Sequence, residues 1–181
     1  MQSKHALPAR GLYRFALFAL LLAAGVLGAR FARAADSQSP APDCPRAMSL
    51  EAADVQAEAV CVLRQYLQIN TTNPPGNELA SARFLAAFLK REGIESQLFE
   101  RQPGRANLYA RLPGDGSRKA LMLVHHMDVV PARPEEWTVP PFDGEVRDSY
   151  VWGRGAVDNK GSGVMELLAV VLMKRLHLPE I

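Results

Sequence analysis

The chain has 181 residues, of which 48% are hydrophobic and 22% charged, a composition typical of a globular protein rather than a disordered one. Its length allows one ordinary domain together with a targeting segment. Five of its 21 Lys and Arg residues lie in residues 1–34, which hold no acid, so the remaining residues carry 16 bases against 19 acids. Because the basic charge belongs mostly to this first segment, nucleic acid is excluded as a predicted partner.

Residues 1–34 have the parts of a secretory signal peptide. A basic start precedes an apolar run over residues 15–29, and Ala32-Arg33-Ala34 offers small residues at the two positions that signal peptidase reads. We therefore predict cleavage after Ala34 and export to the periplasm or the medium. An uncleaved segment that anchors the chain is the alternative, although the apolar run is shorter than the roughly 20 residues that span a bilayer. No other membrane contact is expected.

Residues 35–48 are rich in Ser, Pro, Asp and Ala, which predicts a flexible tether. The sequence contains two cysteines, Cys44 and Cys61. In an oxidising compartment the pair can form a disulfide that ties the tether to the first helix. The alternative is one buried thiol and one exposed thiol. Neither cysteine has another Cys or a His at the spacing of a metal site.

Apolar residues recur at helical spacing from Ser49, a plausible N-cap, to about Asn70. The paired prolines in residues 71–77 exclude a helix there and predict a loop. A second helix is predicted from Glu78 to Arg91, with Gly93 suited to its C-terminal cap. A third is predicted from about Gly161 to Leu176.

Strands are predicted between the second and third helices. Residues alternate between apolar and polar at 96–100 and 107–112, and a short strand is expected around Val151. Ala120 to Val124 is a continuous apolar run, which indicates a strand buried on both faces. Helices that alternate with strands favour an α/β fold built in layers. Residues 49–181 are therefore predicted to form part of one α/β domain.

The most informative polar residues follow the apolar run, in His125-His126-Met127-Asp128. Open α/β sheets place ligands where a buried strand ends. A neutral imidazole is a good zinc ligand, and a carboxylate two residues later can accept the other ring N–H and fix the tautomer. Such a triplet is also common by chance, so a surface histidine or a core histidine with satisfied hydrogen bonds is the alternative.

A second candidate segment is Gly153-Arg154-Gly155-Ala156-Val157-Asp158-Asn159-Lys160-Gly161. The glycines allow a tight turn that presents Asp158 just before the third helix, where a carboxylate can bridge two metal ions. Asp158 can instead simply cap that helix. A phosphate-binding loop is a weaker interpretation, since the glycine spacing does not fit Gly-x-Gly-x-x-Gly.

The ordered combination of these segments with others in the chain indicates a protein family more specifically than any one segment does alone. Residues 72–78 (TNPPGNE), 126–131 (HMDVVP), Trp137, 140–142 (PPF) and 153–161 (GRGAVDNKG) resemble metallopeptidase family M20. That family includes aminoacylase, carboxypeptidase G, succinyl-diaminopimelate desuccinylase and acetylornithine deacetylase. The resemblance covers residues 51–176 and implies the N-terminal part of a three-layer α/β/α zinc-hydrolase-like catalytic domain.

The resemblance also implies roles for individual residues. His126 is similar to the first ligand of one zinc ion. Asp128 is similar to the acidic residue of the catalytic site that orients the imidazole of this ligand. Asp158 is similar to the carboxylate that bridges two zinc ions, and the peptide bond after it is cis in that family. His125 departs from the small residue usual at its position. We expect its side chain to point away from the site, because adjacent strand residues face opposite sides.

In the same family the general-base Glu, the other ligands and a dimerising lid domain come further downstream. The acids after Asp158 are Glu166 and Glu180, the one later histidine is His177, and none of them is expected to fill those roles. The predicted activity is zinc-dependent hydrolysis of an amide bond in a peptide or N-acyl amino acid, with two Zn²⁺ per complete site. This chain is expected to be incomplete, to bind zinc weakly and to turn over little substrate. The alternative is a non-enzymatic fragment that is unfolded or acts only as a binding module.

Overall fold

The computed structural model describes residues 42–178. The predicted signal peptide over residues 1–34 and the start of the predicted tether lie outside these residues. Within the described range, no helix combines the length and the apolarity that crossing a membrane requires.

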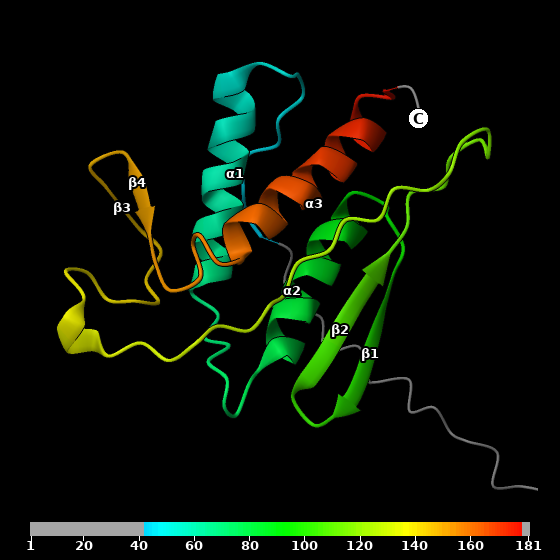
Figure 1. The fold of residues 1–181 in the computed structure, drawn as a ribbon. Coiled ribbons are helices and arrows are strands. Elements are labelled where there is room, and N and C mark those ends of the chain that lie inside the picture. The colour runs from blue at the N-terminus through cyan, green and yellow to red at the C-terminus, as the bar shows by residue number, and fades with distance from the viewer. Residues whose placement is uncertain (1–41, 179–181) are drawn as a thin grey trace, which may run out of the picture. The chain divides into compact units, whose positions relative to one another are not determined.

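Three helices carry most of the hydrophobic core: α1 (Ala52–Leu67), α2 (Glu78–Arg91) and α3 (Lys160–Arg175). Each presents an apolar face at helical spacing, and α1 lies beside α3 (Figure 1). The rings of Tyr66 and Phe84 stack with their centroids 5.8 Å apart, which joins α1 to α2. These rings belong to a cluster of buried hydrophobic side chains. Burying one large hydrophobic side chain contributes about 1.5–3 kcal/mol, so the cluster holds the helices together. Its members are Val62, Tyr66, Phe84, Leu85, Phe88, Leu89, Ile94, Val164, Leu168 and Val171, together with Cys44.

The strands form two separate antiparallel pairs. β1 (Ser96–Gln102) pairs with β2 (Arg105–Ala110), and this hairpin packs against α2 (Figure 1). β3 (Glu145–Arg147) pairs with β4 (Tyr150–Trp152) after a short 3-10 helix at Pro134–Glu136. The mixture of packed helices and strands confirms the predicted α/β class.

The segment expected to be a fully buried strand, residues 120–124, differs from that expectation. It does not form a strand, and the side chains of Leu121 and Met122 are 84% and 82% exposed. A strand needs a neighbour to accept and donate its backbone hydrogen bonds, and no described segment pairs with this one. The prediction of burial was therefore wrong for these residues as they stand in this structure.

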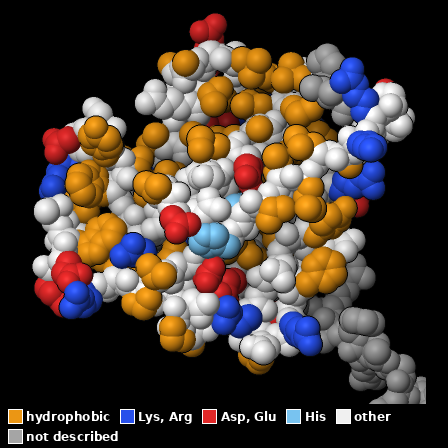
Figure 2. Space-filling view, viewed as in Figure 1, with side chains coloured by type: hydrophobic (Ala, Val, Ile, Leu, Met, Phe, Trp, Pro, Cys, Tyr) orange, Lys and Arg blue, Asp and Glu red, His pale blue; other side chains and the backbone are white. Residues whose placement is uncertain are grey.

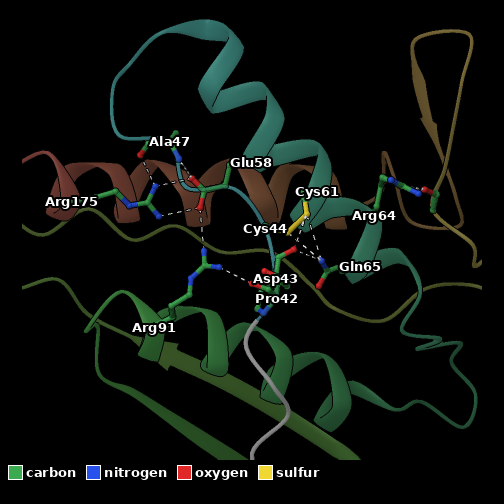
Figure 3. The surroundings of a disulfide bond; sticks show 11 residues. Pro42, Asp43, Cys44, Ala47, Glu58, Cys61, Arg64, Gln65, Arg91 and Arg175 are labelled. Atoms are coloured by element: carbon green, nitrogen blue, oxygen red, sulfur yellow. Dashed lines mark hydrogen bonds and ion pairs between the residues drawn. A yellow bond between two sulfur atoms is a disulfide. The ribbon is translucent and has the colours of Figure 1, made fainter.

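Residues 42–48 also differ from the flexible tether predicted for residues 35–48. Cys44 forms a disulfide with Cys61 of α1, which decides between the two interpretations of the cysteines (Figure 3). Ala47 is buried, and its N–H donates to the Glu58 carboxylate at 2.8 Å. The guanidinium of Arg91 donates to Pro42 O at 2.6 Å. This part of the chain is fastened to the helices because its backbone groups find partners there.

A buried ion network lies beside the disulfide. Glu58 of α1 is fully buried and accepts hydrogen bonds from Arg175 of α3 at 2.7 and 3.0 Å and from Arg91 of α2 at 3.2 Å (Figure 3). Glu92 accepts from the same two arginines and from Arg46. A buried carboxylate is tolerated only when it is paired and hydrogen-bonded in this way, so the network fixes how the three helices meet.

Candidate metal centre

The loop between α1 and α2 holds the segment that carries His126 and Asp128. Thr71 Oγ1 donates to Met127 O at 2.6 Å, and Val129 N donates to Thr71 O at 3.1 Å. Asn73 N donates to Val129 O at 2.9 Å, and the Asn73 side-chain amide donates to Asp128 Oδ2 at 2.9 Å. The predicted loop over residues 71–77 therefore positions residues 127–129.

His126 lies between two aspartates that are distant in sequence. Its Nδ1 is 3.2 Å from Asp128 Oδ1 and 3.0 Å from the Asp128 backbone oxygen, and its Nε2 is 2.9 Å from Asp158 Oδ1. Half of the His126 side chain is exposed, and the Asp158 side chain is 86% exposed. Figure 2 shows a histidine and neighbouring carboxylates reaching the surface together, on a face with many hydrophobic side chains. The two segments singled out in the sequence therefore meet in space.

The electrostatics follow from these contacts. The hydrogen bond to Asp158 raises the pKa of His126 above its ordinary value, against the lowering effect of partial burial. The hydrogen bond from the Asn73 amide holds the pKa of Asp128 below its usual range. Asp128 is thus kept ionised as an acceptor for the imidazole.

The donor atoms fit a zinc ion. A neutral imidazole has one N–H, and the two Asp128 oxygens beside Nδ1 place it there. The lone pair of Nε2 then faces the Asp158 carboxylate, and two acceptors approach so closely only when they share a proton or a cation. Two ligands that each lie about 2.0–2.1 Å from a tetrahedral zinc ion are roughly 3.3–3.4 Å apart. The 2.9 Å between these atoms is shorter than that, so the exposed Asp158 side chain would move outward slightly to admit the ion.

The ligand set is nevertheless incomplete in this part of the protein. Across residues 42–178, no group of three or more His, Cys, Asp and Glu side chains is placed to hold a metal ion. His126 and Asp158 therefore supply two of the roughly four ligands that zinc requires.

Comparisons with known proteins bear on the same region. Residues 122–180, which include His126, Asp128 and Asp158, match the family model for peptidase family M20/M25/M40. Aminoacylase-1 from Sus scrofa is 35% identical over 118 residues, which are 64% of this chain and 29% of that protein. Succinyl-diaminopimelate desuccinylase from Bradyrhizobium is 34% identical over 125 residues, 66% of this chain and 32% of that protein.

A solved structure agrees with these sequence matches. The M20 family metallo-carboxypeptidase from Sulfolobus solfataricus superposes with a TM-score of 0.57 at 27% identity, over 64% of this chain and 27% of that one. This chain resembles the N-terminal part of an M20 peptidase. The resemblance drawn from the ordered motifs is thereby confirmed, and the chain spans less than a third of the length of each of these relatives.

The M20-like segment that ends in Asp158 is a sequence of tight turns. Gly155 has a φ of 91°, and a Cβ at that position would lie 2.7 Å from the Val129 side chain, so only glycine fits. The Asp158–Asn159 peptide bond is cis, as the resemblance to the M20 family implied. Helix α3 begins at Lys160, two residues after Asp158, so Asp158 lies just before the helix.

His125 points away from the M20-like site, as expected for the neighbour of a residue in an extended segment. Its Nδ1 lies 3.5 Å from Glu166 Oε2 on α3, and its ring meets Tyr66 edge to face. A Cβ on Gly163 would lie 2.4 Å from the His125 ring, so the helix admits this histidine only because residue 163 is glycine. Burial lowers the pKa of His125, which keeps the ring neutral more readily than an exposed histidine.

An open cavity of about 280 Å³ lies next to the M20-like site. Its lining includes His126, Asp158, Trp137 and Arg154. The Arg154 guanidinium lies over the Trp137 ring, 5.1 Å from its centroid, and the Arg154 backbone N–H donates to Pro141 O at 2.6 Å. Residue 154 thus joins the proline-rich loop to the glycine-rich loop at the edge of the cavity.

The structure brings His126, Asp128 and Asp158 together, and it leaves His177 exposed after the end of α3. Glu180 lies outside the described residues, and Glu166 faces His125. Two residues with a part in the M20-like site had no role assigned from the sequence. In the sequence, Asn73 stands out only as part of the loop motif at residues 72–78, and Lys160 only as part of the glycine-rich segment at residues 153–161.

Proposed function

We propose that this chain supplies part of the catalytic site of a zinc-dependent hydrolase that cleaves an amide bond in a peptide or an N-acyl amino acid. The observation that supports the proposal most directly is His126 between Asp128 and Asp158, with its Nε2 2.9 Å from an exposed carboxylate. The similarity to aminoacylase-1 and to succinyl-diaminopimelate desuccinylase supports the same substrate class.

In the proposed site His126 and Asp158 hold the metal, and Asp158 has a second oxygen available for another ion. Asp128 holds the imidazole in the tautomer that leaves Nε2 free, and Asn73 holds Asp128 in turn. The chemistry that zinc supplies in such hydrolases is polarisation of a carbonyl oxygen and activation of water. The cavity beside Trp137 and Arg154 is where the substrate would lie.

The same reasoning sets how much activity to expect. The described residues hold two candidate metal ligands, His126 and Asp158, and no group of three or more such side chains. We therefore expect weak zinc binding and little or no turnover of N-acetyl amino acids. A rate that chelation abolishes and that approaches a typical kcat of about 10 s⁻¹ would contradict this expectation.

The test of the site is zinc affinity, measured by competition with a chromophoric chelator and by metal content from mass spectrometry. We expect His126→Ala to weaken zinc binding by roughly tenfold or more, since it removes one of two donors. His177→Ala is the matched control, because His177 is exposed and remote from Asp158 in the fold. Equal affinity in wild type and His126→Ala would remove the basis for the metal site.

Export is part of the proposal. Disulfides persist mainly in oxidising compartments, and the Cys44–Cys61 bridge supports the signal peptide predicted over residues 1–34. Expression of the full chain followed by fractionation and mass measurement tests this. The expected product is an exported chain that begins at Ala35, and retention of residues 1–34 on a membrane fraction would favour the anchored alternative.

A binding module without enzymatic activity is the second candidate. The exposed apolar side chains of residues 121–124 favour it, because extended apolar segments with unpaired backbone groups readily pair with another polypeptide. Absence of zinc binding in a folded wild-type chain would support this function over the enzymatic one.

A further inference from the structure

Lys160 is the first residue of α3, and it is completely buried. Its Nζ donates to Ile69 O at 2.7 Å and to Tyr66 O at 3.0 Å, and it lies over the Tyr66 ring, 4.7 Å from the centroid. Within residues 42–178 no ion pair joins this ammonium group to a carboxylate. Burying an unpaired charge is unfavourable, so carbonyl oxygens and an aromatic face are its compensation.

Tyr66 lies in the last turn of α1, and Ile69 follows the end of that helix by two residues. The last carbonyls of a helix have no partner within the helix, and the cation of a lysine satisfies them while matching the negative end of the helix dipole. An apolar side chain of similar size would remove the donor from Ile69 O and would leave Tyr66 O with only the bond from Ile69 N at 3.2 Å. Lys160 therefore ties the end of α1 to the beginning of α3.

Asp158 lies two residues before this tie. In the described structure its side chain has one hydrogen-bond partner, His126, and it is 86% exposed. Packing of the carboxylate itself does little to place it, so its position depends on the backbone of residues 155–161. That backbone is held by the bond from Lys160 N to Gly155 O at 2.9 Å and by the tie that the Lys160 side chain makes to α1.

We infer that Lys160 is a positioning residue whose buried side chain holds the Asp158 carboxylate against His126. The part of this inference that concerns the position of Asp158 depends only on the contacts described here. The part that concerns metal binding rests on the proposed function. It assigns Lys160 no contact with metal or substrate.

A pair of substitutions separates the hydrogen bonds from the bulk of the side chain. Lys160→Met and Lys160→Gln have side chains of similar length, but only Gln can donate a hydrogen bond to the carbonyls. The matched control is Lys174→Met, because Lys174 lies at the other end of α3 and its Nζ also donates to a backbone oxygen, that of Gly93.

The first measurement uses metal-free protein. The ¹⁵N resonance of His126 Nε2, assigned by its loss in His126→Ala, reports the contact with Asp158, and Asp158→Asn gives the value without the carboxylate. We expect Lys160→Met to move the resonance most of the way to that value, Lys160→Gln to move it part of the way, and Lys174→Met to leave it in place. Near-ultraviolet circular dichroism establishes that each variant is folded.

An unchanged resonance in folded Lys160→Met overturns the inference, and so does an equal shift in Lys174→Met. If Lys160→Met does not fold, Lys160→Gln decides alone. Its side chain is one bond shorter than that of lysine and cannot reach both carbonyls, so an unchanged resonance in this variant also overturns the inference.

The second measurement is zinc affinity, which should fall roughly tenfold in Lys160→Met and remain unchanged in Lys174→Met. If wild type binds no zinc while the resonance shifts as expected, the proposed function fails and the positioning role stands. If wild type binds zinc and the resonance does not shift, the reverse holds.

Discussion

Asp128 acts on the proposed metal through His126, and the strength of that effect can be measured. Asp128→Asn keeps the shape of the side chain but removes the negative charge that favours the N–H on Nδ1. We expect zinc affinity to fall about 10–100-fold, the range seen when a group that orients a ligand is removed. The melting temperature should change little, because Asp128 is partly exposed.

Asp148→Asn is the matched control for that substitution. Asp148 is 79% exposed and has a φ of 53°, a backbone conformation that asparagine also tolerates well. Zinc binding should be unaffected. Equal losses in the two variants would mean that charge in general, and not the contact with His126, governs the affinity.

Gly163 gives a test of where His125 points. Alanine usually stabilises a helix by about 1 kcal/mol relative to glycine. At position 163 we expect the opposite, a loss of about 1–3 kcal/mol, because the new methyl group would overlap the His125 ring. Urea denaturation of Gly163→Ala, with and without His125→Ala, measures this. Failure of His125→Ala to recover stability in the double variant would contradict the described orientation.

Glu92 makes the stability of the fold depend on pH. Burial raises the pKa of this carboxyl. Hydrogen bonds from Arg46, Arg91 and Arg175, together with the charge of Arg175, lower the pKa by more than burial raises it, so it lies below the ordinary value. A carboxyl whose pKa is lower in the folded state stabilises the fold above its unfolded pKa and loses that contribution as the pH falls through the folded pKa.

Glu92→Gln should therefore destabilise the protein by about 1–3 kcal/mol at neutral pH, where a charge-assisted hydrogen-bond network is lost. The difference from wild type should shrink as the pH falls below the ordinary glutamate pKa of about 4.3. Urea midpoints between pH 7 and pH 3 test this, with Glu135→Gln on the exposed 3-10 helix as control. A difference that does not depend on pH would contradict the role of ionised Glu92.

At the scale of whole elements, the segment before α1 depends on its covalent link. The Cys44–Cys61 disulfide closes a loop with a sequence separation of 17, and cross-links of this size stabilise by about 3 kcal/mol. Reduction, or replacement of both cysteines by alanine, should lower the unfolding free energy by about 2–4 kcal/mol. Denaturant titrations with and without a reductant measure it, and coincident curves would mean that the ion network alone fastens this segment.

The helices could be predicted from sequence more closely than the strands. Glu78–Arg91 was predicted with the bounds that α2 has, and α3 differs from its predicted range by one residue at each end. Such helices are local, since apolar spacing and caps fix them. Residues 120–124 show the limit, because an apolar run predicts burial but cannot say which strand will pair with it.

For the whole molecule, the largest gap in prediction lies in contacts between distant residues. Glu58 and Arg175 are separated by 117 positions, and neither belongs to a motif. The Lys160 contacts with Tyr66 and Ile69 span more than 90 positions. Periodicity and motifs reflect the conformation of residues that are close in sequence, so a single sequence could not predict these long-range contacts. The convergence of His126 and Asp158 could be predicted from the family resemblance.

The exposed apolar residues predict how the whole chain behaves in solution. Leu121, Met122 and Val124 are largely exposed and adjacent, so we expect association or precipitation at micromolar concentration. Leu121→Lys with Val124→Lys should shift the chain to a monomer in light scattering without lowering the melting temperature. Met48→Lys, at a separate exposed position, is the control, and an equal effect there would argue against a specific surface.

The buried Glu58 also has a consequence for when the chain can fold. During synthesis α1 emerges long before Arg175 exists, and until then Glu58 would have to enter an apolar interior without two of the four hydrogen bonds that it accepts. We therefore expect the packing of α1 to be unfavourable until Arg175 is available. For the export proposed above, such a delay would be useful, because α3 would complete this network only after the preceding residues had passed the translocation channel.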